Sequence, residues 1–278
     1  MNNSVFKTEA GRDKIRSYYN RVLGQFPFGQ QYVDTAFGRT FILTAGRESN
    51  PPVILLHGSC SNSAFWFPEM MALSKHFRVY AVDIIGEAGN SEEYRPDLSS
   101  DAFALWMKDV LDALGLKKTI LIGNSLGGWM ALKFATAYPE RVSRLILIAS
   151  AGLAQIRPQF LSNVGQTRQA DGTVPVNPDI IGEQSIPKEV LDFINLIVEN
   201  YNPIQNLPVY ADGQLQRLNM PVLFIDGVED AIIDAEKSAQ RLTGLVPSAI
   251  IHLLPGCGHV VTHSLEYIVP FLMKIHPV

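Results

Sequence analysis

With 278 residues, of which 47% are hydrophobic and 18% charged, the chain can bury one large core and has the composition of a folded protein. Its net charge is −4 and no cluster of lysines and arginines runs along it, so we expect no nucleic-acid partner. No stretch approaches the roughly 20 apolar residues of a membrane span, and the first residues lack the apolar core of a signal peptide. We therefore expect a cytoplasmic protein with no membrane partner.

The number of cysteines and the spacing of potential metal ligands exclude further classes of protein. Cys60 and Cys257 are too few for a disulfide framework, in agreement with a reducing compartment. The sequence has no zinc-type spacing of His, Cys, Asp and Glu, and neither a G-x-G-x-x-G motif nor a P-loop follows a predicted strand. We expect no metal and no cofactor.

The N-terminal part of the chain is predicted to contain one helix and two strands. Residues 8–26 place apolar side chains such as Ile15 and Tyr19 on one helical face, which suits packing against the body of the protein. Strands are predicted over residues 32–36 and 40–44, with the turn between them at Gly38.

From residue 51 onward, short apolar runs alternate with helical stretches of about fifteen residues. The runs are continuously hydrophobic instead of alternating, as strands covered on both faces require. This pattern predicts an α/β fold with a mostly parallel central sheet flanked by helices. The strands are predicted over residues 53–56, 79–82, 119–122, 145–148, 222–225 and 249–254, and the helices over 63–75, 99–114, 126–138, 234–245 and 263–275.

Residues 151–219 form an insertion that is longer than one crossover needs and is rich in Pro and Gly. Helices are predicted over residues 188–200 and from Gln214 onward. The insertion leaves from the carboxyl end of a strand, the edge where open α/β sheets bind ligands. We expect it to be a cap over a core domain made of residues 1–150 and 220–278. Its apolar side chains are candidates for a substrate lining, although core packing explains them equally well: Phe160, Leu161, Phe193, Leu196, Ile197, Tyr201 and Tyr210.

The stretch Gly123-Asn124-Ser125-Leu126-Gly127 ends a β-branched run and opens a helical one. In a G-x-S-x-G turn, the serine takes a strained backbone conformation that exposes its hydroxyl at the helix N-terminus, where free N–H groups favour a developing negative charge. An ordinary Gly-rich turn with a solvent-facing serine has the same motif. The strand-turn-helix context favours the catalytic interpretation.

A nucleophilic serine needs a base, and the base needs an acid. His259 follows the last predicted strand at the same edge as Ser125, and His57 is its main competitor. Asp230 follows the strand over residues 222–225 and completes the chain order Ser, Asp, His that this sheet architecture uses. Three neighbouring carboxylates are alternatives that are expected to be solvated or to cap a helix: Asp226, Glu229 and Asp234.

Two backbone amides are candidates for an oxyanion hole. The Leu126 amide follows from the turn itself, because it lies at the start of the predicted helix. The second candidate is the Ser59 amide in the loop after the strand over residues 53–56, where a plain strand exit is the competing interpretation.

Taken together, these residues resemble the serine hydrolases of the α/β-hydrolase superfamily, from about residue 30 to the C-terminus and more weakly through the insertion. The resemblance implies the α/β-hydrolase fold and a structural role for His57. Because a serine occupies the elbow, it disfavours the related dehalogenases and epoxide hydrolases, which use a carboxylate. Four matches carry it: Leu55-Leu56-His57-Gly58; Asp83-Ile84-Ile85-Gly86 with Gly89 and Ser91; Gly123 to Gly128; and Gly227 with Asp230, followed by Gly258-His259.

One loop departs from the family pattern. Where the family reads D-x-x-G-x-G-x-S, this chain carries an extra residue, with Glu87-Ala88 between Gly86 and Gly89. The loop is therefore expected to present a different surface to the site.

The residues and the resemblance predict a serine hydrolase that cleaves a small to medium, apolar carboxylic ester through an acyl-enzyme intermediate on a Ser125, His259 and Asp230 triad. The elbow is also similar to that of hydrolases that cut carbon–carbon bonds in ring-cleavage products, and thioester, lactone or amide cleavage is compatible with the same triad. A third class is a non-catalytic ligand-binding or signalling protein that keeps the fold.

Overall fold

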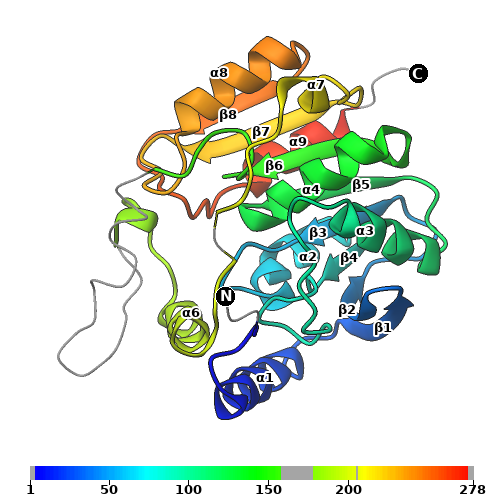
Figure 1. The fold of residues 1–278 in the computed structure, drawn as a ribbon, viewed down its shortest axis with the longest axis vertical. Helices are drawn as coiled ribbons and strands as arrows, with labels where there is room; N and C mark the ends of the chain where they lie inside the picture. The colour runs from blue at the N-terminus through cyan, green and yellow to red at the C-terminus, as the bar shows by residue number, and fades with distance from the viewer. Residues whose placement is uncertain (1–3, 158–177, 205, 275–278) are drawn as a thin grey trace.

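The computed structural model describes residues 4–157, 178–204 and 206–274. Their strands form one sheet of eight, in the order β1-β2-β4-β3-β5-β6-β7-β8. β1 pairs with β2 and β2 with β4 in antiparallel fashion, and every other pairing is parallel. The predicted mostly parallel sheet is therefore confirmed (Figure 1). The strands are β1 (Gly29–Thr35), β2 (Gly38–Ala45), β3 (Pro52–Leu56), β4 (Arg78–Val82), β5 (Thr119–Asn124), β6 (Val142–Ile148), β7 (Val222–Gly227) and β8 (Ile250–Leu254).

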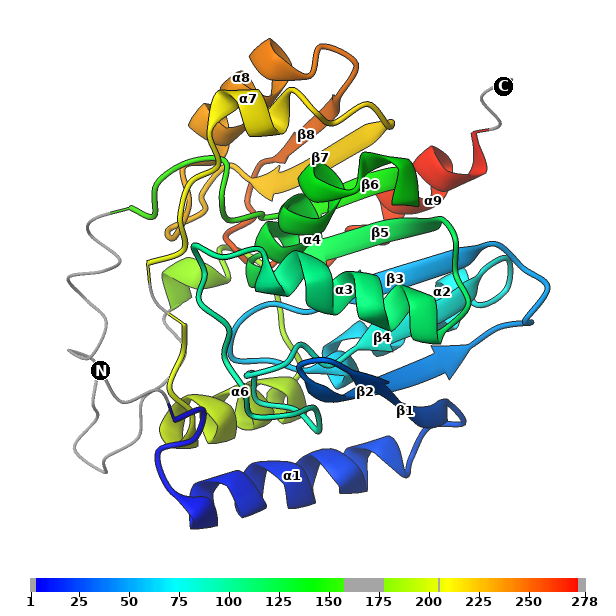
Figure 2. The same cartoon turned by 45° about the vertical axis from the view of Figure 1, so that its right-hand side comes forward.

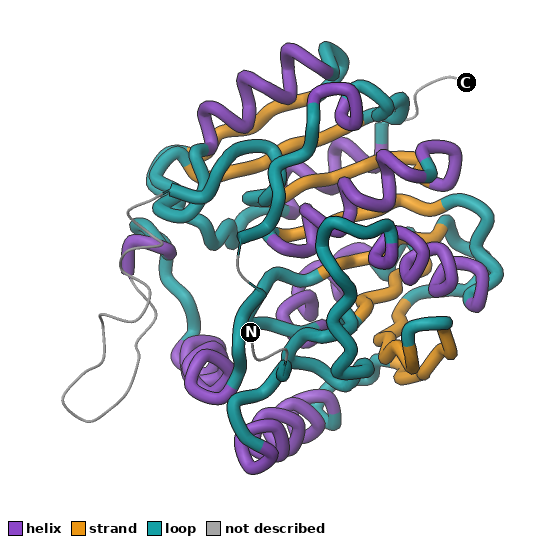
Figure 3. The backbone as a smooth tube through the Cα atoms, in the orientation of Figure 1, coloured by secondary structure: helices purple, strands orange, loops and turns teal. Residues whose placement is uncertain are grey.

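Helices cover both faces of the sheet, and each face has its own apolar core (Figures 2 and 3). In β3, Ile54 and Leu56 belong to one core, whereas Val53 and Leu55 belong to the other. Because successive strand residues point to opposite faces, a strand covered on both sides must be apolar throughout. One face carries α3 (Ala102–Ala113), α4 (Leu126–Ala137), α7 (Asp212–Leu215) and α8 (Ala235–Leu245); the other carries α2 (Phe67–Leu73) and α9 (Leu265–Met273).

Several predicted helix boundaries were wrong, and local side-chain hydrogen bonds explain where two of the helices begin. The N-terminal helix α1 spans Glu9–Leu23, and Thr8 caps it by accepting a hydrogen bond from the Gly11 amide. The helix predicted from residue 99 begins at Ala102, because Asp97 accepts hydrogen bonds from the amide and hydroxyl of Ser99 and holds a turn there.

Two further predicted helices are shorter or divided. The helix predicted over residues 63–75 consists of a 3₁₀ turn, Ser63–Trp66, followed by α2, which has a proline in its first turn. The helix predicted from Gln214 is the four-residue α7. Further 3₁₀ turns lie at Pro139–Arg141 and Pro178–Ile180.

Helix α6 (Lys188–Asn200) belongs to the insertion and lies beside α1 at the carboxyl edge of the sheet (Figures 1 and 2). The Tyr18 and Phe193 rings join the two helices, with centroids 4.6 Å apart. The chain before α1 also holds the end of α6, because the Lys7 amide donates to the Asn200 carbonyl and the Asn202 amide to the Val5 carbonyl. The insertion is thus anchored to the N-terminal part of the chain. None of the helices in the described ranges is long and apolar enough to cross a membrane.

Candidate active site

Ser125 lies between β5 and α4 in a strained backbone conformation, with φ at 50°. A non-glycine residue pays for positive φ with steric strain, so the surrounding structure must hold it there. Its amide donates to the Ile148 carbonyl at 2.9 Å, and its carbonyl accepts from the Trp129 and Ala151 amides at 3.0 and 3.2 Å. Contacts from β6 and α4 therefore fix the turn and the direction of the hydroxyl.

The two glycines of the motif permit close approach of the backbones around Ser125. A Cβ atom on Gly123 would lie 2.2 Å from the Gly127 carbonyl oxygen, and one on Gly127 would lie 2.0 Å from the Leu56 carbonyl oxygen. Both distances are far below van der Waals contact. Glycine is required at both positions because a side chain would push α4 away from the ends of β3 and β5.

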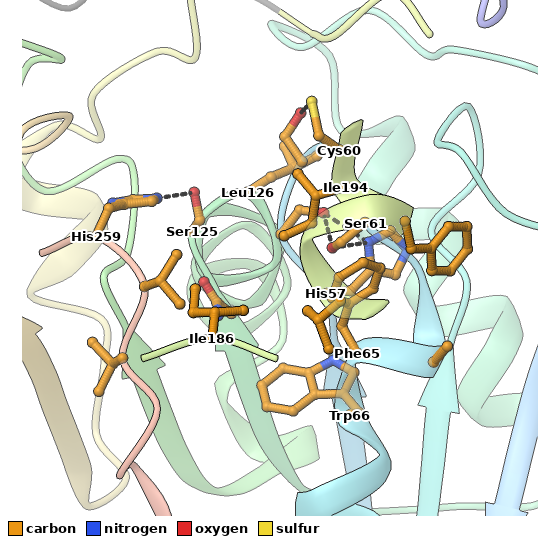
Figure 4. A pocket seen from close by; sticks show the side chains of 18 of the residues that line it. His57, Cys60, Ser61, Phe65, Trp66, Ser125, Leu126, Ile186, Ile194 and His259 are labelled. Carbon is orange, nitrogen blue, oxygen red and sulfur yellow. Dashed lines mark hydrogen bonds between the residues drawn. The ribbon is translucent and has the colours of Figure 1, made fainter. Parts of the chain in front are cut away.

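The structure brings Ser125, His259 and Asp230 together, although they come from three different loops. His259 Nε2 lies 2.9 Å from Ser125 Oγ, and His259 Nδ1 lies 2.7 Å from Asp230 Oδ2. Figure 4 shows the Ser125 hydroxyl directed at the imidazole ring. In this arrangement Nδ1 donates to the carboxylate, which leaves the lone pair of Nε2 available to the serine proton.

The Asp230 carboxylate is buried but well supplied with donors. Besides His259, it accepts the Ile232 and Ile233 amides on Oδ1 at 2.6 and 2.8 Å. Burial by itself raises the pKa of Asp230, but the adjacent His259 and the backbone donors outweigh it and leave the pKa below its usual value. Asp230 is therefore charged at neutral pH and can stabilise an imidazolium.

The insertion contacts the loop that carries His259. The sequence did not predict this contact. Gly182 pairs with Cys257 as an isolated antiparallel bridge, and the Val260 amide donates to the Ile180 carbonyl at 3.0 Å. Gln184 accepts hydrogen bonds from the Thr262 amide and hydroxyl. No local pattern predicts these contacts, because they join residues nearly eighty positions apart.

His57, the competing base, is engaged elsewhere. Its Nε2 accepts the Ile84 amide at 3.0 Å, and its Nδ1 lies 2.8 Å from the Gly58 carbonyl, to which it donates. Burial lowers the pKa of His57, so the neutral ring with a proton on Nδ1 is favoured. The ring joins the ends of β3 and β4.

The other carboxylates near Asp230 behave differently from one another. Asp234 caps α8, because its side chain accepts a hydrogen bond from the Lys237 amide at 3.1 Å. A helix cap was one of the two roles expected for this carboxylate. Asp226 is neither solvated nor a cap, and this expectation was wrong: its side chain is completely buried at the end of β7.

Ser59 and Leu126 both line the cavity in front of Ser125. Leu126 is the first residue of α4, so its N–H has no partner within the helix. Neither amide donates to another backbone group in the described parts of the chain. Both remain candidates for holding an oxyanion.

A cavity of about 1730 Å³ opens beside Ser125 and His259. Its walls are mainly apolar and include residues of α1, α2 and α6 and of the loop after β3. Of the insertion side chains considered from the sequence, Phe193 lines it, whereas Phe160 and Leu161 lie outside the described residues. The other four pack against the apolar cores, as Phe193 also does: Leu196, Ile197, Tyr201 and Tyr210.

The described ranges contain no group of three or more His, Cys, Asp or Glu side chains placed to hold a metal ion. The polar groups that converge on the cavity are instead those of an acyl-transfer site: a hydroxyl, an imidazole with its carboxylate, and backbone amides.

Comparison with known proteins agrees with this geometry. Residues 51–196 match the model of a family described as having the alpha/beta hydrolase fold. The chain is 32% identical to the carboxylesterase YbfK of Bacillus subtilis, covering 88% of this chain and 86% of that one. It is 30% identical to the uncharacterized carboxylesterase nap of the same organism, covering 94% and 92%. The crystal structure of YbfK superposes with a TM-score of 0.83 and 29% identity, covering 95% and 97%.

Proposed function

This chain belongs to the α/β-hydrolase fold family, and on that premise we propose that it is a serine carboxylesterase acting on small to medium, apolar carboxylic esters. The observation that carries the proposal is the continuous hydrogen-bonded line from Ser125 Oγ through His259 to Asp230, which opens onto an apolar cavity. The carboxylesterase relatives support the same reaction class.

Acylation begins when Ser125 Oγ attacks the ester carbonyl carbon and passes its proton to His259 Nε2. Asp230 stabilises the imidazolium and keeps Nε2 directed at the serine. The carbonyl oxygen becomes an oxyanion, which the Leu126 and Ser59 amides bind. Collapse of the tetrahedral intermediate breaks the bond to the alkoxy oxygen, and His259 returns its proton to the departing alcohol.

Deacylation repeats these steps with water as the nucleophile. His259 takes a proton from the water as it attacks the acyl carbon, and the same two amides bind the second oxyanion. The proton then returns to Ser125 as the carboxylic acid leaves. The enzyme ends with the serine and imidazole in their starting states.

Residues 151–219 are the cap in this proposal, and residues 1–150 with 220–278 are the core domain. Side chains from the described part of this segment, such as Ile186, Phe193 and Ile194, form one wall of the cavity. An apolar wall excludes water from the ester and strengthens the electrostatic interactions that stabilise the transition state.

Replacing Ser125 by alanine tests the proposal directly. The Ser125→Ala variant should lose hydrolysis of p-nitrophenyl acetate by about 10⁴-fold or more, because no other group supplies the nucleophile. It should also lose covalent labelling by a fluorophosphonate probe, since that reaction needs an activated serine. The matched control is Ser74→Ala, a partly exposed serine that follows α2, and it should keep both activities.

Two other outcomes separate the rival functions. If the probe labels Ser125 but no ester is hydrolysed, and the protein instead turns over a vinylogous diketone, a thioester, a lactone or an amide, then the bond in that substrate is the one it cleaves. Absence of labelling in the folded wild-type protein would favour a non-catalytic ligand-binding protein of the same fold.

We also propose a cytoplasmic location. Cys60 and Cys257 are both free, in accord with a reducing compartment. Cell fractionation with an antibody against the chain tests this directly, and recovery in the membrane or culture medium would contradict it.

A further inference from the structure

Asp226, at the end of β7, is a completely buried carboxyl group beside the proposed triad. Its Oδ1 accepts the Gly227 amide at 2.8 Å. Its Oδ2 is also buried, and the described residues offer it no N–H or O–H donor. An ionised carboxylate can only accept hydrogen bonds, so a charged Asp226 would leave one oxygen buried without a partner.

Three neighbouring groups influence the protonation state of Asp226. They are Asp230 from the loop after β7, the Gly227 amide, and at longer range Arg157 from the segment after β6. The negative charge of Asp230 acts on the Asp226 carboxyl. Two adjacent buried carboxylates repel each other when both are charged, so we expect one of them to carry a proton.

The donors around each carboxyl determine which one holds that proton. Asp230 accepts from the His259 ring and from two backbone amides, whereas Asp226 accepts from one amide. Negative charge is therefore stabilised on Asp230. The proton belongs on Asp226, and Oδ2 is the atom left to carry it.

We propose that Asp226 is a positioning residue: as a neutral carboxylic acid it donates a hydrogen bond to Asp230 and fixes the carboxylate that orients His259. This inference rests on the proposed function. It adds a fourth donor to Asp230 and links the end of β7 to the base on the neighbouring loop.

The arrangement makes hydrolysis sensitive to alkaline pH. Burial, followed by the negative charge of Asp230, raises the pKa of Asp226 well above its usual value, so the proton is kept at neutral pH. Once pH exceeds that pKa, two adjacent buried carboxylates repel each other and Asp230 leaves its position. Hydrolysis should then fall.

Two substitutions at Asp226 separate donation from packing. Asp226→Asn keeps the shape and a donor but cannot ionise, so its neutral-pH kcat/KM should stay within about threefold of wild type and its alkaline fall should disappear. Asp226→Leu removes the donor, so kcat should drop by about tenfold with KM nearly unchanged. Asp234→Asn changes the neighbouring cap carboxyl, and its rate and pH profile should match wild type.

Equal losses in Asp226→Asn and Asp226→Leu, or an alkaline fall that persists in Asp226→Asn, would overturn the inference. Infrared difference spectra at neutral pH locate the proton independently of turnover. The wild-type minus Asp226→Asn difference spectrum should contain a carboxylic-acid carbonyl band, and the absence of this band would refute the assignment even if Asp226→Leu fails to fold. If the band behaves as expected while the wild type hydrolyses no ester, the proposed function fails and the location of the proton stands.

Discussion

Two loops at the carboxyl edge of the sheet each bury two carboxyl groups: residues 83–91, which follow β4, and residues 226–234, which include the last two residues of β7. In each loop one carboxylate is surrounded by donors. Asp83 accepts from the Tyr19 hydroxyl and from the Ser63 and Asn90 amides at 2.7 to 3.0 Å, much as Asp230 accepts from His259 and two amides.

The second carboxyl in each loop lacks such donors. Glu87 has no hydrogen-bond partner on either oxygen among the described residues, and Arg95 lies 4.0 Å away. Burial raises the pKa of Glu87 to about 7, against the opposing effects of the Tyr201 hydroxyl and the Arg95 charge. Burial of a carboxyl therefore does not predict its charge; the number of donors that reach it does.

The loops differ in what their carboxyls touch. Asp230 reaches His259 and through it Ser125, whereas Glu87 faces Tyr201 at the end of α6 and the Cys60 thiol. Burial and then the Glu87 charge raise the pKa of Cys60 to about 12, so this thiol is unreactive at neutral pH although it lines the cavity. The buried carboxyls therefore belong to the proposed triad in one loop and to the surroundings of Tyr201 and Cys60 in the other.

Among substitutions of the carboxyls in these two loops, Asp230→Asn should have the largest effect. Asparagine offers an N–H group to His259 Nδ1 and favours the wrong imidazole tautomer, so kcat for ester hydrolysis should fall by about 10³ to 10⁴ while KM changes little. Steady-state kinetics on p-nitrophenyl esters measure it. A variant that retained more than a tenth of wild-type kcat would remove Asp230 from the mechanism.

The equivalent change in the other loop, Asp83→Asn, should act on stability instead of turnover. One of its oxygens becomes an amide that faces a donor, which should lower the free energy of unfolding by about 2 kcal/mol. The folded protein should keep kcat within a few fold. Urea denaturation compares it with Asp13→Asn, an exposed carboxylate on α1 whose replacement should cost less than about 0.5 kcal/mol. A loss of kcat as large as that of Asp230→Asn would erase the contrast between the loops.

Glu87→Gln should change stability by an amount that depends on pH. The folded state holds the Glu87 proton more tightly than the unfolded chain, so wild-type stability should fall as pH rises from about 4.5 to about 7 and then level off. The total loss is about 3 kcal/mol at most. Glutamine cannot ionise, so the decline should vanish and the variant should be more stable than wild type at pH 8.

Urea melts at pH 5 and pH 8 measure this difference. Glu92→Gln, an exposed carboxylate in the same region, serves as the control and should keep the wild-type pH dependence. A decline that survives in Glu87→Gln would show that another group causes it.

The sequence alone determined the layered fold and named the three side chains that the structure brings together. Both follow from local signals: continuous apolar runs such as residues 145–148 are typical of strands covered on both faces, and Gly123 and Gly127 flank Ser125 at a turn that only glycine permits. The parallel sheet then carries the ends of β5, β7 and β8 to one edge.

Only the tertiary structure decided which carboxyls are buried, which are paired and how the insertion is held. Asp226 and Glu87 look like ordinary loop acids in the sequence, yet both are buried with too few donors. The contact of Gln184 with the loop of His259 is equally invisible there. The physical reason is the same in each case. The charge of a carboxyl and the attachment of the insertion depend on donors and apolar neighbours that lie far away along the chain, and no periodicity or motif in the sequence predicts which of these residues will be in contact.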